Sequence, residues 1–269
     1  MKRVITSVVF IAFLIYLIWW SRSPTPFVIV VFLAALLALR EFYQMAEKLG
    51  AYPEATLGAI ALFALLGSFA WESAEITLAV IAGFQIATMV AALARGRPFE
   101  TALGSIAATT SGVLYVGLFL GYFIALRMID RAGVRSSQLL SLLFLVVWAG
   151  DTGAYYVGRS MGRRKLAPKV SPGKTVEGAV GGLVVGFLGA VIGKLWFYRE
   201  LGWGHVLALS VLLGTMGILG DLCESVLKRG AQLKDSGSMI PGHGGFLDRL
   251  DSLVFNAPLV YYYYRYLLA

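Results

Sequence analysis

Long apolar runs separated by short polar segments dominate the hydropathy pattern of this chain. A membrane-spanning helix needs about 20 mostly apolar residues, and nine runs approach that length. They cover residues 4–20, 26–40, 56–72, 75–94, 101–127, 137–158, 177–198, 203–223 and 252–268. We therefore predict an all-α, polytopic integral membrane protein with about nine transmembrane helices. The second run could continue past Arg40 as an interfacial helix, and the fifth could be broken at Thr109–Gly112.

Lysine and arginine in the polar segments predict how the chain is oriented, because cytoplasmic loops carry an excess of them. The 159–176 segment has six basic residues and no acidic residue, which is typical of a cytoplasmic loop. With the N-terminus also placed in the cytoplasm, the segments 41–55, 95–100 and 224–251 lie on that same side. The 128–136 segment, with its two arginines, weakly favours the opposite orientation.

The composition agrees with a membrane protein and changes how the charge is interpreted. Hydrophobic residues make up 58% of the chain and charged residues 14%, whereas soluble domains are about one-quarter charged. A net charge of +8 would suggest nucleic acid as a partner of a soluble protein. Here the basic cytoplasmic loops and anionic lipid explain it, so we expect no nucleic-acid partner. The single cysteine, Cys223, excludes an intrachain disulfide.

Many of the few charged residues fall between Gly220 and Asp251, and five glycines interrupt that stretch. In the predicted topology the acidic residues at the ends of the last four helices meet at one membrane face. These are Asp151, Glu177, Asp221, Glu224, Asp248 and Asp251. Charges at helix ends often mark only the interface, which would explain Glu224 and Arg229. Asp151 and Asp221 have apolar neighbours, so a polar cavity explains them better.

Acids, bases and glycines in one stretch are typical of a site for a metal ion and phosphates. Carboxylate oxygens bind Mg²⁺, which prefers to share its ligands with substrate phosphates. Lysine, arginine and backbone N–H groups of glycine-rich loops hold phosphate oxygens. His243 lies in a Pro-Gly-His-Gly-Gly turn without a second histidine or cysteine nearby. We therefore expect it to bind phosphate or to shape the loop, and we expect no zinc site.

Residues 171–178 contain the Gly-Lys-Thr ending of a nucleotide-binding P-loop. The full pattern requires glycine at position 168, where Pro168 stands, and a preceding strand, which we do not expect here. We therefore reject a P-loop. Lys174 and Thr175 at a helix start remain candidates for phosphate contacts, because helix N-termini favour anions. They could instead be a lipid-headgroup anchor and an N-cap.

The 177–198 run carries glycines at four-residue spacing, at Gly178, Gly182 and Gly186, and again at Gly189 and Gly193. Such ridges allow two membrane helices to approach closely. The contact could lie within one chain or between two copies. We predict a homodimer through these glycine-rich helices.

Two segments of the acidic stretch resemble the signature of phosphatidate cytidylyltransferases, also called CDP-diacylglycerol synthases. The first reads Ser225-x-x-Lys228-Arg229-x4-Lys234-Asp235-x-Gly237. The second reads Pro241-x-His243-Gly244-Gly245-Phe246-x-Asp248-Arg249-Leu250-Asp251. Residues 171–178 and the region of Asp151 resemble the family as well. The resemblance covers the C-terminal half closely and the N-terminal half only in hydropathy.

The resemblance implies that CTP and phosphatidic acid react to give CDP-diacylglycerol and pyrophosphate, with Mg²⁺ as the cofactor. This reaction belongs to phospholipid biosynthesis, and we expect the site to face the cytoplasm from the plasma (inner) membrane. Residues 1–100 would then be N-terminal transmembrane helices. Residues 101–269 would be the catalytic region, with the cytoplasmic loops 159–176 and 224–251.

Roles for individual residues follow from the resemblance and the chemistry. As catalytic residues we expect Asp221, Asp248, Lys228, Lys234 and Asp251. As ligands of Mg²⁺ we expect Asp221 and Asp248, with Asp251 or Asp235 as a further ligand. Contacts with the substrates are expected from Lys174, Thr175, Ser225, Arg229, His243, Gly244, Gly245 and Arg249. Asp151 and Glu177 would support the polar cavity or a second cation.

Other functions remain open on the sequence alone. A CTP-dependent polyprenol or phytol kinase, or a cytidylyltransferase for an ether lipid, would need a similar membrane site. A transporter would use buried acids to bind coupling ions, but these acids gather at one face and no inverted repeat is visible. A nonenzymatic scaffold gives no reason for the paired acids and bases.

Overall fold

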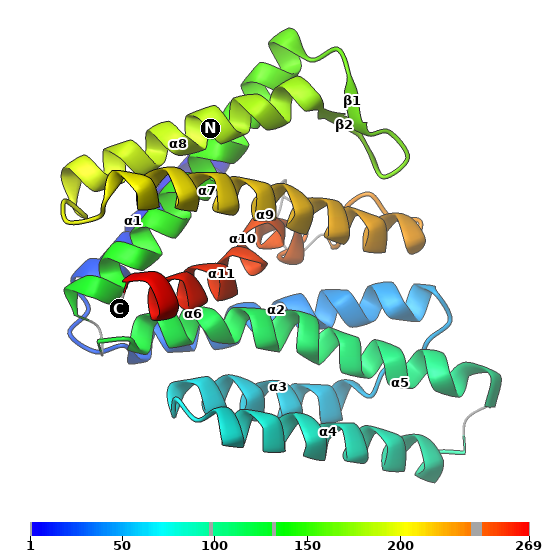
Figure 1. The fold of residues 1–269 in the computed structure, drawn as a ribbon. Coiled ribbons are helices and arrows are strands. Elements are labelled where there is room, and N and C mark those ends of the chain that lie inside the picture. Colours follow the sequence, from blue (N-terminus) through cyan, green and yellow to red (C-terminus); the bar gives the residue numbers. More distant parts are fainter. Residues whose placement is uncertain (1, 97–98, 131–132, 238–243, 269) are drawn as a thin grey trace.

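Helices make up almost all of this protein in its computed structural model, which describes residues 2–96, 99–130, 133–237 and 244–268 (Figure 1). The N-terminal half contains α1 (Lys2–Trp19), α2 (Thr25–Lys48), α3 (Ala55–Ala70), α4 (Ala74–Ala94), α5 (Phe99–Val113), the π-helical turn η1 (Leu114–Leu118) and α6 (Phe119–Met128). The C-terminal half contains α7 (Val134–Met161), β1 (Lys165–Ala167), β2 (Ser171–Thr175), α8 (Val176–Trp196), α9 (Trp203–Gly230), the 3-10 turn η2 (Leu247–Arg249), α10 (Asp251–Val254), α11 (Asn256–Tyr263) and the π-helical turn η3 (Tyr264–Leu268).

Six helices in the described part of the chain are long and apolar enough to cross a membrane. They are α2, α4, the continuous helix from Phe99 to Met128, α7, α8 and α9. The prediction of a helical integral membrane protein is therefore confirmed. The predicted runs at 4–20, 56–72 and 252–268 form shorter or interrupted helices, so nine spans and their orientation stay predictions.

Two details of the helix predictions can be compared with the structure. The second run does continue past Arg40 as part of α2, and Glu41 and Tyr43 are buried there against the rest of the protein. The fifth run does not break at Thr109–Gly112, because α5 continues to Val113. The irregularity is the π-helical turn η1, a type of distortion that interrupts helices without ending them.

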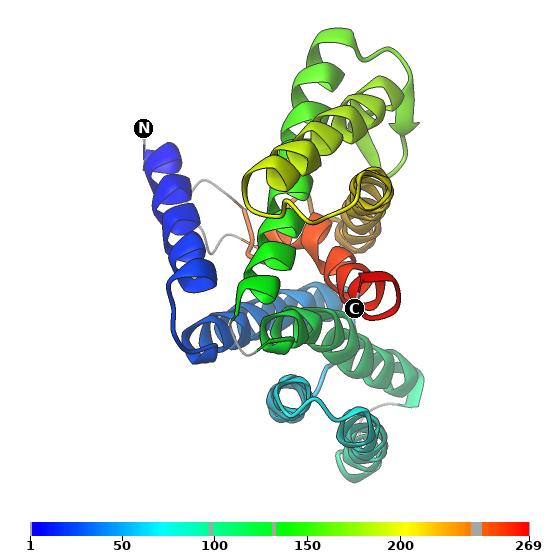
Figure 2. The ribbon, with the colours of Figure 1, turned by 60° about the vertical axis from the view of Figure 1, so that its left-hand side comes forward.

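The helices form two groups with the C-terminal helices between them (Figures 1 and 2). The helices α7, α8 and α9 pack on one side, and α2, α5 and α6 lie on the other, with α3 and α4 farthest from α8. The short helices α10 and α11 lie between the groups and contact α9, α6 and α7. This arrangement places the end of the acidic stretch in the middle of the protein.

The glycine ridge of α8 packs against α7 of the same chain. A Cβ atom on Gly182 would lie 3.0 Å from the carbonyl oxygen of Gly150, and one on Gly178 would lie 2.9 Å from that of Ala154. Only glycine allows the two backbones this close approach. The ridge is therefore occupied within the chain, and a homodimer would need another surface.

A short antiparallel hairpin joins α7 to α8, with Lys165 opposite Thr175 and Ala167 opposite Ser171. The expectation that no strand precedes Lys174 is therefore wrong, although Pro168 still departs from the P-loop pattern. Thr175 ends the hairpin and is the N-cap of α8, because its hydroxyl accepts a hydrogen bond from the Gly178 N–H at 3.1 Å.

Candidate active site

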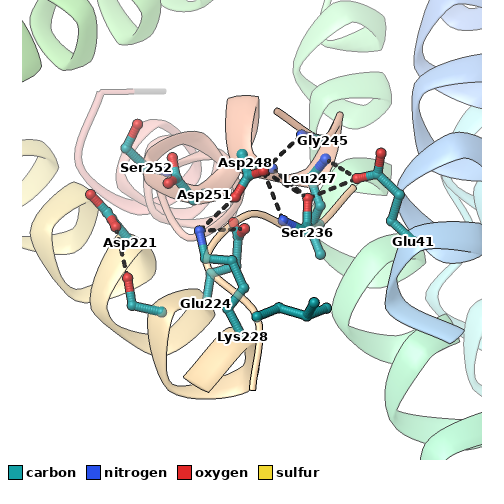
Figure 3. A network of polar contacts seen from close by, with 12 residues as sticks. Glu41, Asp221, Glu224, Lys228, Ser236, Gly245, Leu247, Asp248, Asp251 and Ser252 are labelled. Atoms are coloured by element: carbon teal, nitrogen blue, oxygen red, sulfur yellow. Dashed lines mark hydrogen bonds and ion pairs between the residues drawn. The ribbon is translucent and has the colours of Figure 1, made fainter. Parts of the chain in front are cut away.

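One face of the last turns of α9 carries a line of polar side chains. Asp221, Ser225 and Lys228 follow at intervals of four and three residues, which places them on the same side of a helix. The ammonium of Lys228 lies 3.1 Å from a Glu224 carboxylate oxygen and 2.6 Å from Asp248 Oδ1. The Glu224 side chain is 0% exposed and that of Lys228 only 10%. Two carboxylates therefore share one buried cation (Figure 3).

Asp248, in η2, also organises the loop that precedes it. Its Oδ2 accepts hydrogen bonds from the backbone N–H groups of Ser236 at 2.9 Å and Gly245 at 2.8 Å, and from the Ser236 hydroxyl at 3.0 Å. Burial opposes the charged form, but the Lys228 ammonium and these two N–H groups outweigh it and hold the pKa of Asp248 below its usual value. Asp248 is thus a charged anchor whose two oxygens both have protein donors.

Glu41, near the end of α2, holds the same loop from the opposite side (Figure 3). Its Oε1 accepts a hydrogen bond from Phe246 N–H at 2.8 Å, and its Oε2 accepts one from Leu247 N–H at 2.8 Å. The Ser236 hydroxyl lies 2.9 Å from Oε2 and shares its single proton between Glu41 and Asp248. Glu41 is 1% exposed. A helix of the N-terminal half therefore supplies a buried carboxylate to the signature segment of the C-terminal half.

The glycines of this loop fit around the two carboxylates. A Cβ atom on Gly245 would lie 2.5 Å from Glu41 Oε2 and 2.6 Å from the backbone nitrogen of Gly237, which no real Cβ atom does. Gly244 has a φ of +80°, a left-handed conformation that side chains other than glycine rarely adopt. Close approach to Glu41 and Asp248 thus explains why glycine stands at both positions.

A second acidic group lies beside the first, where α7, α9 and α10 meet. Asp221 Oδ2 lies 2.5 Å from the Lys174 ammonium on β2, and its Oδ1 accepts a hydrogen bond from the Ser225 hydroxyl at 3.3 Å. Asp151 accepts a hydrogen bond from the Ser252 hydroxyl at 2.9 Å. Asp251, at the start of α10, interacts electrostatically with both Asp221 and Asp151. Carboxylates from α7, α9 and α10 therefore lie in the same region, and one of them, that of Asp221, pairs with Lys174.

The remaining predicted residues lie around this centre. Arg229 ties the hairpin to the loop, because it donates hydrogen bonds to the carbonyl oxygens of Val170 at 3.2 Å and Leu233 at 3.0 Å. Glu177 accepts hydrogen bonds from the backbone N–H groups of Arg163 and Arg164, and so holds the start of the hairpin instead of facing the acids. Three further side chains are exposed, those of Lys234, Asp235 and Arg249. His243 lies outside the described residues.

The acids differ in how well they suit a metal ion. Among the described residues, no three Asp, Glu, His or Cys side chains are grouped as ligands of one ion. The oxygens of Asp248 accept from backbone N–H groups as well as from side chains, and its side chain is 7% exposed. The oxygens of Asp221 contact two side chains, those of Lys174 and Ser225, and its side chain is 32% exposed. Asp221 is therefore the more accessible of the two carboxylates, and carboxylate oxygens suit Mg²⁺.

The two most deeply buried carboxylates were given no site role on the sequence. Glu224 was expected among the acids at one membrane face, with a simple helix-end charge as the alternative, and Glu41 fell on the possible interfacial helix past Arg40. Both follow long apolar runs, and a charge in such a position is costly unless it has a partner. The cost of an unpaired charge could therefore have indicated from the sequence that both residues have buried partners.

Fold and site together define a helical membrane protein that brings buried acids and bases from both halves of the chain to one place. The chain belongs to the cytidylyltransferase family, whose sequence profile matches residues 1–267. It is 34% identical over 268 residues to the phosphatidate cytidylyltransferase of Bacillus subtilis (strain 168), covering 97% of this chain and 96% of that protein. It is 37% identical over 265 residues to the phosphatidate cytidylyltransferase of Staphylococcus haemolyticus (strain JCSC1435), covering 96% and 97%.

The similarity also reaches cyanobacteria. The phosphatidate cytidylyltransferase of Synechocystis sp. (strain ATCC 27184 / PCC 6803 / Kazusa) is 34% identical over 297 residues, covering 97% of this chain and 95% of that protein. The resemblance seen in the signature segments is therefore confirmed. It extends over nearly the whole chain, beyond the C-terminal half in which the motifs lie.

Glu41 provides a test of the loop contacts. Replacing Glu41 with glutamine exchanges one accepting oxygen for an NH₂ group, which would face N–H or O–H donors. An unsatisfied buried donor costs about 1–3 kcal/mol, so we expect the loop 231–250 to be cleaved faster in limited proteolysis followed by mass spectrometry. Glu75→Gln, an exposed change on α4, is the control and should leave the cleavage rate unchanged. Equal cleavage of both variants would contradict the role of Glu41.

Proposed function

We propose that this protein transfers a cytidylyl group from CTP to phosphatidic acid, and so makes CDP-diacylglycerol for phospholipid biosynthesis. An ionised oxygen of the lipid phosphate attacks the α-phosphorus of CTP. A new P–O bond forms there, the bond to the β-phosphate oxygen breaks, and pyrophosphate leaves. The names of the relatives and the family match over the whole chain support this reaction.

The ion pair between Lys174 and Asp221 is the observation that carries the proposal. It joins the basic hairpin, which suits phosphates, to the acidic face of α9, which suits a metal ion. Attack on CTP requires both, because the triphosphate is polyanionic and is bound with its cation. Asp221 already holds the Lys174 ammonium and has Asp151 and Asp251 in the same region, so it suits a cation that is bound together with phosphates.

We propose that Mg²⁺ binds at Asp221 and Asp251, with Asp151 nearby. When bound, the ion neutralises charge on the phosphate oxygens and polarises them. Lys174 is then free to contact a phosphate, and the side chain of Lys228 keeps Glu224 and Asp248 compensated. The predicted pair of Asp221 and Asp248 as joint ligands remains the alternative, in which Asp248 would exchange protein donors for the ion.

The remaining side chains act by position and charge. The attacking phosphate oxygen is ionised near neutral pH, so no strong general base is needed. Alignment of the two substrates and neutralisation of the developing charge would supply most of the acceleration, as in other phosphoryl transfers. Lys234, Gly244 and Arg249 are close in sequence to the ion-paired Asp248 or Lys228, and in our proposal they hold the triphosphate or the lipid phosphate.

We further propose that the site faces the cytoplasm from the inner membrane. The hairpin is basic. The C-terminal ends of α2 and α9 and the N-terminal end of α5 lie at the same end of the molecule as the hairpin (Figure 1). Basic segments of this kind stay in the cytoplasm. A homodimer remains a prediction, and it would use a surface other than the glycine ridge of α8.

The test is pyrophosphate release by the purified protein in detergent with CTP, phosphatidic acid and Mg²⁺, omitting each component in turn. We expect release only with all three, and CDP-diacylglycerol as the lipid product on thin-layer chromatography. A phosphorylated lipid with CDP as the second product would identify a kinase instead. Ion flux in liposomes without a CTP-dependent product would favour a transporter.

A further inference from the structure

An open groove lies between α2, α5 and the end of α9. It has a cavity volume of about 490 Å³, within the range of ligand sites in proteins. Phe42 and Met45 of α2 and Leu227 of α9 form its apolar walls. Along α5 the groove is lined by the small residues Gly104, Ala107, Ala108 and Ser111, and at the start of that helix by the polar residues Glu100 and Thr101.

The groove lies next to the charged site along both helices. On α2, Glu41 binds the signature loop and the next residue, Phe42, lines the groove. On α9, Lys228 forms the buried ion pairs and the preceding residue, Leu227, lines the groove. On each helix, a residue of the buried charged network is therefore followed or preceded directly by a residue of the groove wall. A phosphate bound beside this network would lie close to an acyl chain in the groove.

The other side of the same turns of α2 is polar. Gln44, Glu47 and Lys48 line a separate groove with a cavity volume of about 720 Å³, together with Lys234 and Asp235. An acyl chain in this polar groove would bury charged groups, which costs free energy. In the apolar groove it would bury apolar surface, which is favourable. The end of α2 thus separates a surface suited to hydrocarbon from one suited to a hydrophilic ligand.

We infer that the groove between α2, α5 and Leu227 holds an acyl chain of the lipid substrate, with the lipid phosphate directed toward the charged site. The inference rests on the proposed function for the identity of the lipid. Gly104, Ala107 and Ala108 then contact the hydrocarbon. The volume of the groove limits which acyl chains fit and so determines the acyl-chain preference. The lipid enters beside α5, from the half of the bilayer nearest the hairpin.

Filling the groove at Gly104 tests this inference. A Cβ atom there would have no other atom within 4 Å, so Gly104→Trp adds its ring to open space without displacing backbone. We expect the ratio of KM for dioleoyl- to dihexanoyl-phosphatidic acid to rise about tenfold, equivalent to about 1.4 kcal/mol. The matched control is Leu103→Trp, the neighbouring residue, which is 78% exposed and outside the groove. It should leave the ratio unchanged.

A second measurement separates the groove from the reaction itself. Phosphatidic acid with a diazirine on its acyl chain should label Met45 and Leu227 in the wild-type protein, and label them less in Gly104→Trp. An unchanged KM ratio together with labelling elsewhere would overturn the groove assignment, even if the wild type makes CDP-diacylglycerol. Labelling in the groove by a wild type that makes no such product would overturn the proposed function alone.

Discussion

Replacing Asp221 with asparagine is expected to lower turnover by about 10³-fold, or about 4 kcal/mol in the activation barrier. Asparagine keeps the size of the side chain but removes the charge that holds Lys174 and, in our proposal, Mg²⁺. A bound metal ion supplies several kcal/mol of charge stabilisation, so loss of a ligand should appear mainly in kcat and in the Mg²⁺ concentration required. Both are measured with saturating CTP and phosphatidic acid while Mg²⁺ is varied.

The matched control is Asp130→Asn, because Asp130 is an exposed aspartate at the start of α7. Its Oδ1 accepts a hydrogen bond from Gly133 N–H and its Oδ2 accepts one from Arg135 N–H. Asparagine keeps one of these two acceptors, and because the position is exposed, water can replace the other. This variant should turn over like the wild type. Near wild-type turnover of Asp221→Asn at saturating Mg²⁺ would show that Asp221 is not a metal ligand.

The second large effect is expected from Lys228→Met, which removes the cation shared by Glu224 and Asp248. Breaking a buried ion pair leaves charge without a partner and typically costs about 3–5 kcal/mol. We therefore expect a lower unfolding temperature in detergent and loss of CDP-diacylglycerol formation. Lys169→Met, a change at an exposed position in the hairpin, should leave both unchanged.

A double variant shows whether charge is the cause. Adding Glu224→Gln to Lys228→Met removes one of the two uncompensated carboxylates, so part of the lost stability should return. A double-mutant cycle on the unfolding free energy measures this coupling. Independent effects of the two substitutions would mean that packing, and not charge, explains the loss.

The sequence predicted the features that depend on local pattern. Apolar runs identified most of the helices, and the spacing of charged residues and glycines in 225–251 identified the family. Contacts between distant segments were less accessible. Nothing near Glu41 in the chain shows that it meets the backbone of Phe246 and Leu247, because that contact depends on how α2 packs against the loop.

The same reason explains the other differences. The hairpin was missed because its strands are short and its sequence is mostly polar. The glycines of α8 indicated a close helix contact, but periodicity cannot distinguish α7 of the same chain from a second copy. Lys228 was expected as a catalytic residue, but its sequence position did not show that its ammonium lies between Glu224 and Asp248.

Glu41 also bears on how this protein can be divided. A fragment starting at residue 101 would retain every signature residue, yet the backbone N–H groups of Phe246 and Leu247 would lose their acceptor. Truncation, domain exchange or circular permutation would therefore have to keep α2 beside the C-terminal segment. The hydrogen bonds of Glu41 join residues 1–100 to residues 101–269, so a chimaera should not combine these two parts from different proteins.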